Sequence, residues 1–175
     1  MSKDKCRCKG YKCMCKYKER YNSLCSETNT IYSAFRADTS GSLDQILDGT
    51  LPVEKVFFKN EIFDIENEYD SSTSTFTAKH SGVYHFIASL HFLPLSFVKD
   101  FQVRVQIFVN GSVNAADVEF QGTESSFTLG IEINSIVQLN AGDYVEVFAS
   151  STIRGILVQD LGNTFAGARF PSPVE

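Results

Sequence analysis

The most reactive side chains belong to five cysteines, which all fall within the first 25 residues of the 175-residue chain. Four of them follow a C-x-C-x4-C-x-C pattern and the fifth comes later: Cys6, Cys8, Cys13, Cys15 and Cys25. Four thiolates at this spacing could bind a soft ion such as Zn²⁺ or Cu(I). The thiols could instead be oxidised to disulfides between chains, because an odd number leaves at least one thiol for another chain. We favour cross-linking over metal binding, with an inert tail as the third interpretation.

Other groupings with catalytic potential are absent from the sequence. It contains no G-x-S-x-G, H-E-x-x-H or phosphate-binding motif. The three histidines lie in one short region without a paired Cys or Ser in their sequence context. Neighbouring acids such as Asp64, Glu66 and Glu68 are typical of a solvated surface. We therefore expect no enzymatic activity and no resident cofactor.

Charge divides the chain into a basic tip and an acidic body. Residues 1–20 hold eight basic and two acidic residues, a net charge of +6, whereas the rest of the chain carries −11. An acidic body is a poor binder of nucleic acid, so we expect no nucleic-acid partner. No run of about 18 apolar residues is present, which predicts no membrane insertion. The charged N-terminus also lacks the apolar region of a signal peptide.

We expect residues 1–27 to form a basic, Cys-rich tail, either disordered or cross-linking, and residues 28–175 to form one domain. The whole chain is 43% hydrophobic, which is enough for a single core. Alternating apolar and polar residues predict strands, and the clearest candidates are residues 82–92, 101–109, 127–133 and 144–149. The dipeptide Asn110-Gly111 favours a tight hairpin turn. About eight to ten short strands without a helical stripe predict an all-β sandwich or barrel.

Five blocks of the sequence occur in an order and spacing that are typical of one family. They are residues 33–36 (SAFR), residues 58–86 (with Asn60, Tyr69, Asp70, Phe76, Thr77, Gly82, Val83, Tyr84 and Phe86), residues 109–111 (VNG), residues 139–145 (LNAGDYV) and residues 164–167 (TFAG). Together they resemble the C1q domain of the C1q/TNF superfamily over residues 31–170. The resemblance implies an all-β, C1q/TNF-like jelly-roll β-sandwich of about ten antiparallel strands that forms homotrimers. Without a collagen stalk or a body disulfide, the chain looks more like the bacterial branch, which includes spore-surface proteins.

Three strands carry a second face that is too apolar for plain exposure to solvent. If Tyr84 and Phe86 fill the core, the residues that alternate with them along the strand face outward. The resemblance implies that such faces pack around a three-fold axis, and we expect eight residues there: Val83, His85, Ile87, His91, Arg104, Phe108, Tyr144 and Phe148. His85 and His91 could make assembly sensitive to pH, although neutral, hydrogen-bonded histidines are the interpretation we favour.

Some trimers of this family bind calcium near their apex, which draws attention to three carboxylates: Asp117, Glu119 and Glu124. They follow the Asn-Gly hairpin, where we expect a loop, and hard oxygen ligands in a loop suit Ca²⁺. Calcium therefore stands as a candidate ligand of the body, beside zinc or copper in the tail.

These features lead to two hypotheses about function. In the first, the chain is a non-enzymatic, trimeric structural or interaction protein of a bacterial spore coat or exosporium, anchored or cross-linked to other surface-layer proteins through its Cys-rich tail. In the second, it is a secreted or surface-displayed recognition module that binds protein or glycan through its apex loops.

Overall fold

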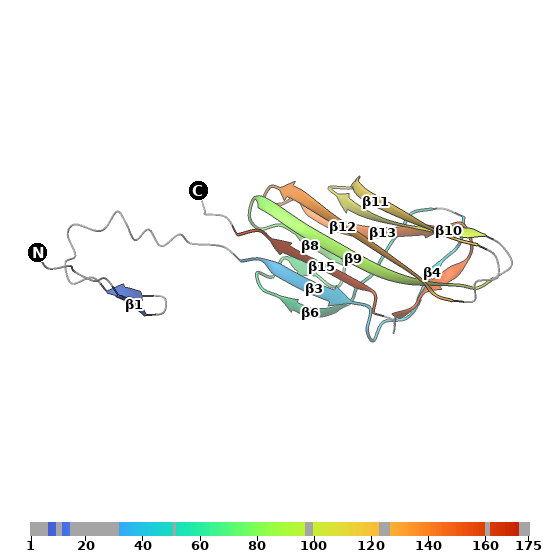
Figure 1. Ribbon diagram of the computed structural model, residues 1–175, viewed down its shortest axis with the longest axis horizontal. Coiled ribbons are helices and arrows are strands. Elements are labelled where there is room, and N and C mark those ends of the chain that lie inside the picture. Colours follow the sequence, from blue (N-terminus) through green and yellow to red (C-terminus); the bar gives the residue numbers. More distant parts are fainter. Residues whose placement is uncertain are drawn as a thin grey trace, which may run out of the picture. The chain divides into compact units, whose positions relative to one another are not determined.

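A computed structural model describes residues 32–50, 52–96, 100–122, 127–159 and 162–171, together with the backbone of residues 7–9 and 12–14. The chain divides into two units, and the larger unit is Tyr32–Pro171. Within the described residues the larger unit consists of β-strands and turns, without an α-helix (Figure 1). That part of the chain accordingly offers no helix of the length and hydropathy that a membrane span requires.

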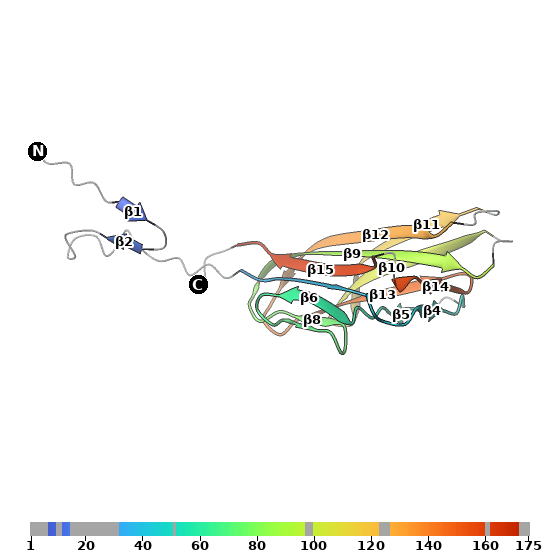
Figure 2. The same ribbon diagram turned by 90° about the horizontal axis from the view of Figure 1, so that it is seen from below.

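Two antiparallel sheets form the body and lie as two layers in Figure 2. We call the first the β10 sheet, which contains β11 (Ser112–Gln121), β10 (Phe101–Val109), β13 (Tyr144–Ser151), β8 (Thr75–Thr77) and β7 (Tyr69–Asp70), with β5 (Glu54–Lys55) also paired to β13. We call the second the β9 sheet, which contains β4 (Gln45–Leu47), β14 (Gly155–Leu157), β9 (Gly82–Pro94), β15 (Thr164–Arg169), β3 (Ala34–Asp38) and β6 (Asn60–Asp64), with β12 (Leu129–Leu139) also paired to β9. The predicted all-β jelly-roll sandwich is confirmed.

Phenylalanine rings fill the space between the two sheets. The Phe35 ring stacks on Tyr69 with a centroid distance of 4.7 Å and meets Phe165 edge-on at 5.0 Å. Along β9 the core residues recur at every second position, so Tyr84 and Phe86 are buried as expected. Interlocked aromatic rings of this kind fix the spacing of the sheets without a Trp or a disulfide in the body.

The central position of β15 depends on a glycine. β15 pairs with β9 on one side and with β3 on the other. A Cβ at Gly167 would lie 2.6 Å from the Phe86 ring and 2.8 Å from the Phe35 ring, which is closer than real atoms approach. Only a residue without a side chain lets the last strand lie this close to the core.

Two strand predictions need correction. The expected strand at residues 127–133 begins only at Leu129, and Phe127 is 77% exposed. Leu129 already pairs with Phe92, so Phe127 lies beyond the ladder and has no place in the core. The predicted strands also omit β4, a short strand that pairs with β14. Strands of two or three residues are too short to show alternation. The sequence therefore predicted fewer strands than the body has.

The smaller unit contains one short antiparallel pair, β1 (Arg7–Lys9) and β2 (Lys12–Met14). Its register pairs Arg7 with Met14, Cys8 with Cys13 and Lys9 with Lys12. Cys6, Cys15 and Cys25 lie outside the described residues.

Candidate assembly faces

The outer surface of the β9 sheet, here called the β9 face, contains four of the eight predicted interface residues. Val83, His85, Ile87 and His91 alternate with the core residues of β9, as expected. Directly opposite residues of an antiparallel pair share one face of the sheet. The register therefore adds further members from β12, β15 and β3: Glu132, Asn134, Ile136, Gln138, Thr164, Ala166, Ala168 and Arg36.

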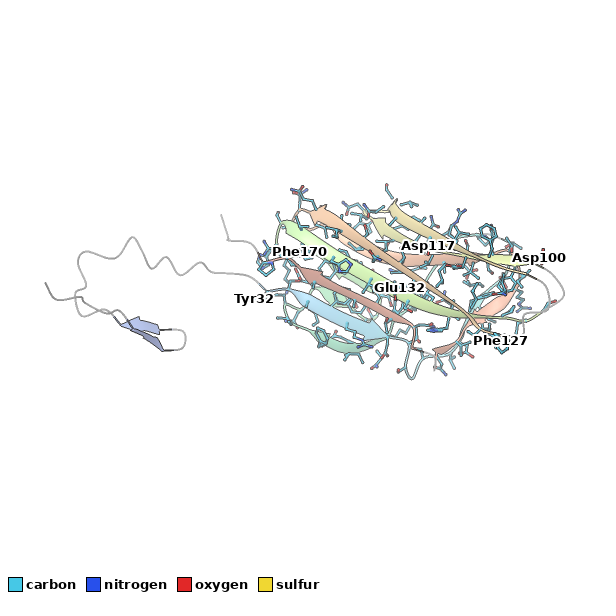
Figure 3. All side chains as sticks on the ribbon, in the orientation of Figure 1. Tyr32, Asp100, Asp117, Phe127, Glu132 and Phe170 are labelled. Carbon is cyan, nitrogen blue, oxygen red and sulfur yellow. The ribbon has the colours of Figure 1, made fainter. Side chains whose placement is uncertain are left out.

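The composition of the β9 face is unusual for a surface that meets only water. Its charged members are Glu132, Arg36 and Asp38, which pairs with Thr164, and Figure 3 shows Glu132 midway along β12. Ile136 pairs with His85 and is 65% exposed. On the side of β9 opposite β12, Ala166 and Ala168 of β15 pair with Ile87 and His85. Their small side chains leave room for another chain to approach β15 closely. Contiguous apolar surface with few charges is typical of a protein–protein interface.

His91 adds an unsatisfied polar atom to this face. Its Nδ1 atom is buried and has no hydrogen-bond partner among the described residues. Gly130 is its register partner, and a Cβ there would lie 3.8 Å from the imidazole, so the ring lies beside bare backbone. A buried nitrogen without a partner costs free energy.

The other four predicted residues lie on the outer surface of the β10 sheet, here called the β10 face. Phe108 and Phe148 pack against each other with ring centroids 4.3 Å apart. Beside them the Lys55 ammonium donates to the Glu146 carboxylate at 2.6 Å, and both side chains are mostly buried. Arg104 and Tyr144 complete the set. This face thus covers part of its own surface within a single chain, although Val113 and Phe120 are exposed and the buried Gln106 Oε1 has no hydrogen-bond partner among the described residues.

The sandwich therefore separates the eight predicted residues into two groups of four. The two sheets turn their outer surfaces in opposite directions, as the layers in Figure 2 show. One flat contact cannot include both groups. The sequence could not reveal this separation, because alternation looks the same in either sheet.

At one end of the sandwich, two sequence blocks far apart in the chain come together. Asn110 and Gly111 both adopt positive φ, at 50° and 75°, as predicted for the hairpin between β10 and β11. The Asn110 side-chain amide donates to Asp143 Oδ1 at 2.9 Å, and its oxygen accepts from the Tyr144 N–H at 3.0 Å. The backbone N–H of Asn140 donates to Asp143 Oδ2 at 2.7 Å. These hydrogen bonds, first that from the Asn140 backbone and then that from Asn110, lower the pKa of Asp143.

The comparison with protein families agrees with this geometry. Residues 34–168 match the model of the C1q domain family. The chain belongs to the C1q domain family. A curated relative, the uncharacterized protein YqcC of Bacillus subtilis (strain 168), is 30% identical over 98 residues, which are 54% of this chain and 26% of that protein. The chain therefore spans about a quarter of the length of this relative.

Solved structures show the same C1q/TNF-like fold. The globular domain of zebrafish complement 1qA protein matches with a TM-score of 0.55 and 18% identity, over 80% of this chain and 98% of that one. Murine APRIL matches with a TM-score of 0.56 and 11% identity, over 80% and 100% of the two chains. The Eiger TNF of S. frugiperda matches with a TM-score of 0.55 and 11% identity, over 83% and 95%. Domains of this superfamily are typically non-enzymatic binding modules, and trimer formation is typical of them.

The calcium candidates of this C1q domain do not lie where we expected. Asp117 and Glu119 lie inside strand β11, not in a loop. They pair with Val105 and Val103, so the strand holds them at the edge of the sandwich. Glu124 lies outside the described residues. Across the ranges that the structure describes, no cluster of three or more His, Cys, Asp or Glu residues could hold a metal ion.

Glu68 is a buried acid that we wrongly expected to be solvated. It is only 4% exposed, accepts a hydrogen bond from the Ser33 hydroxyl, and accepts the backbone N–H of Lys79 at 2.7 Å. Burial, followed by the nearby charge of Glu68, raises the pKa of Tyr84 to about 12. The Tyr84 hydroxyl donates to the His80 carbonyl at 2.7 Å. These groups connect the start of β3 to the entry of β9, which is a structural role.

Proposed function

We propose that this C1q-family chain is a non-enzymatic homotrimeric interaction protein whose three copies meet through the β9 face. The observation that carries the proposal is the composition of that face, where Ile136 is exposed, alanines line β15 and charges are few. Burial in a trimer would remove this apolar surface from water, which favours association. The β10 face, with its internal ring pair and ion pair, then stays outside the three-fold contact.

Two matched substitutions test this proposal. Ile136 and Val113 are β-branched residues on the edge strands β12 and β11, and they are 65% and 53% exposed. Ile136→Asp places a carboxylate in the proposed interface, and we expect the trimer dissociation constant to rise by at least roughly 100-fold, because a buried unpaired charge costs several kcal/mol. Val113→Asp places the same charge on the β10 face, and we expect the trimer to persist.

Sedimentation velocity distinguishes these states, and circular dichroism checks that both variants fold. A wild-type monomer, or dissociation caused by Val113→Asp instead of Ile136→Asp, would contradict the proposed interface.

We further propose that the trimer belongs to a bacterial spore coat or exosporium, where the Cys-rich tail cross-links it to itself or to other surface-layer proteins. The support is the match to a Bacillus protein and the five cysteines confined to the first 25 residues. Under this proposal, antibodies detect the protein in purified spore-surface fractions, and its synthesis is restricted to sporulation. Non-reducing gels of those fractions should show ladders that a reductant abolishes. Synthesis and secretion during vegetative growth would contradict this location.

A cavity favours recognition of glycan as a second candidate function. It measures about 460 Å³ and lies between the segment around Ser40 to Gln45 and the segment from Val56 to Asn60. Its lining combines hydroxyl groups of Ser40 and Ser42 with the Phe57 ring, over which Lys59 Nζ lies at 5.4 Å from the centroid. Asp44 also lines the cavity, and a ring together with hydroxyl, amide and charged groups suits a sugar. Saturation-transfer NMR with simple monosaccharides tests this, and loss of the signal in Phe57→Ala but not in Phe127→Ala is the expected result.

A further inference from the structure

The strand register of the smaller unit pairs two of the tail cysteines. β1 and β2 run antiparallel, and Cys8 is the direct partner of Cys13. Two residues, Gly10 and Tyr11, separate the strands in the sequence. The pair next to this connection is Lys9 with Lys12. No other cysteine has a register partner among the residues whose backbone the structure describes.

The position of this pair in the ladder suits a covalent bond. In a hairpin with a two-residue connection, the pair next to the connection exchanges backbone hydrogen bonds, so the following pair is a non-hydrogen-bonded one. Such pairs bring their Cα atoms to about 4.5 Å, which lies inside the range of roughly 4.4–6.8 Å found for disulfides. We propose that Cys8 and Cys13 form a disulfide within one chain.

The residues beside the two cysteines favour this reaction. Arg7 and Lys9 flank Cys8, and Lys12 precedes Cys13. Positive neighbours stabilise the thiolate, which is the form that attacks a disulfide. In the proposed step, one thiolate attacks a low-molecular-weight disulfide and releases one small thiol. The second thiolate then attacks the mixed disulfide and releases the other small thiol, so two protein thiols are oxidised and one external disulfide is reduced.

This inference deepens the proposed role of the tail and rests on it, because it decides which thiols remain for links between chains. With Cys8 and Cys13 joined to each other, Cys6, Cys15 and Cys25 are left for that purpose. Each chain would then present an odd number of thiols, so at least one either stays a free thiol or reacts outside its own chain.

Two full-length variants with two cysteines each test the pairing. The triple substitution Cys6→Ser, Cys15→Ser and Cys25→Ser keeps Cys8 with its register partner Cys13. The matched control, Cys6→Ser, Cys13→Ser and Cys25→Ser, keeps Cys8 with Cys15 instead. Each variant is equilibrated with mixtures of reduced and oxidised glutathione, quenched by alkylation and measured by intact mass spectrometry. We expect an effective thiol concentration at least roughly tenfold higher for the Cys8–Cys13 variant than for the control.

Equal effective concentrations in the two variants, or oxidation of the Cys8–Cys13 variant mainly to dimers or glutathione adducts, would overturn the proposal. These substitutions leave the core of the body untouched, because the body contains no cysteine. Sedimentation under reducing conditions reports on the trimer separately. Failure of the pairing is therefore distinguishable from failure of the proposed assembly.

Discussion

The β9 face and the β10 face belong to the same sandwich but treat their apolar side chains differently. On the β10 face, Phe108 and Phe148 cover each other, and Lys55 neutralises Glu146 nearby. On the β9 face, Ile136 lies open next to His85, and the small alanines of β15 lie on the other side of β9. Apolar side chains that cover each other within one chain need no second molecule. Apolar side chains that stay open to solvent indicate where a second molecule binds.

The largest expected effect comes from a substitution that disrupts the core between the two sheets. Gly167→Val would place a side chain where a Cβ alone already lies 2.6 Å from the Phe86 ring. We expect the free energy of unfolding to fall by about 3 kcal/mol or more, because overpacking displaces both sheets. Urea denaturation measures this change. Gly122→Ala is the control, since its Cβ would meet only the Asp100 carboxylate at 4.0 Å, and comparable losses in both variants would contradict the packing argument.

A smaller effect separates the two faces. Phe148→Ala should lower the free energy of unfolding by about 1–3 kcal/mol, because it removes a half-buried ring and its contact with Phe108. The trimer should survive at concentrations where the body is folded. Urea denaturation and sedimentation give the two quantities. Loss of the trimer without loss of stability would place the assembly contact on the β10 face.

The ion pair on the β10 face should contribute less than the ring pair. Glu146→Gln removes the carboxylate that Lys55 contacts at 2.6 Å, and we expect a loss of about 1 kcal/mol because the pair is mostly buried. Asp48→Asn breaks the exposed pair with Arg154, whose atoms are 3.7 Å apart, and should change stability by less than about 0.5 kcal/mol. Equal effects would show that burial does not strengthen the β10-face pair.

The smallest effect concerns acid stability at the turn between β12 and β13, which is hydrogen-bonded to the hairpin of β10 and β11. Hydrogen bonds lower the pKa of Asp143 below its value in the unfolded chain. The stabilisation is therefore complete above the unfolded pKa of about 4 and is lost as the pH falls through the lower folded pKa. Thermal melts should show that Asp143→Asn loses stability less steeply than wild type below about pH 4. Equal slopes would contradict this assignment.

Local features of the fold were predictable from the sequence because their causes are local. The alternation along β9 identified Tyr84 and Phe86 as core residues, and Asn110-Gly111 identified its turn. Phe127 was misplaced because the pairing of β12 with β9 begins only at Leu129, although β9 continues to Pro94, and alternation does not show where pairing begins. Glu68 was misjudged because its partner Ser33 lies 35 residues away in the sequence.

The division of the candidate interface could not be predicted for a related reason. Ile87 and Phe148 both show the same alternation with buried neighbours. Which sheet each strand joins depends on pairings between distant segments, such as β13 with β8 and β10. A single sequence does not contain those pairings as a pattern. The sequence therefore identified outward-facing residues correctly but could not sort them by direction.

The central position of β15 also constrains how the body is made in the cell. The neighbours of β15, β9 and β3, are synthesised well before Thr164–Arg169 leave the ribosome. Until that last strand inserts, the sheet has a gap at its centre and Phe86 and Phe35 lack the backbone that covers them. The sandwich therefore cannot close before Thr164–Arg169 have been synthesised and inserted, and a partner that binds the completed β9 face can join only after that step.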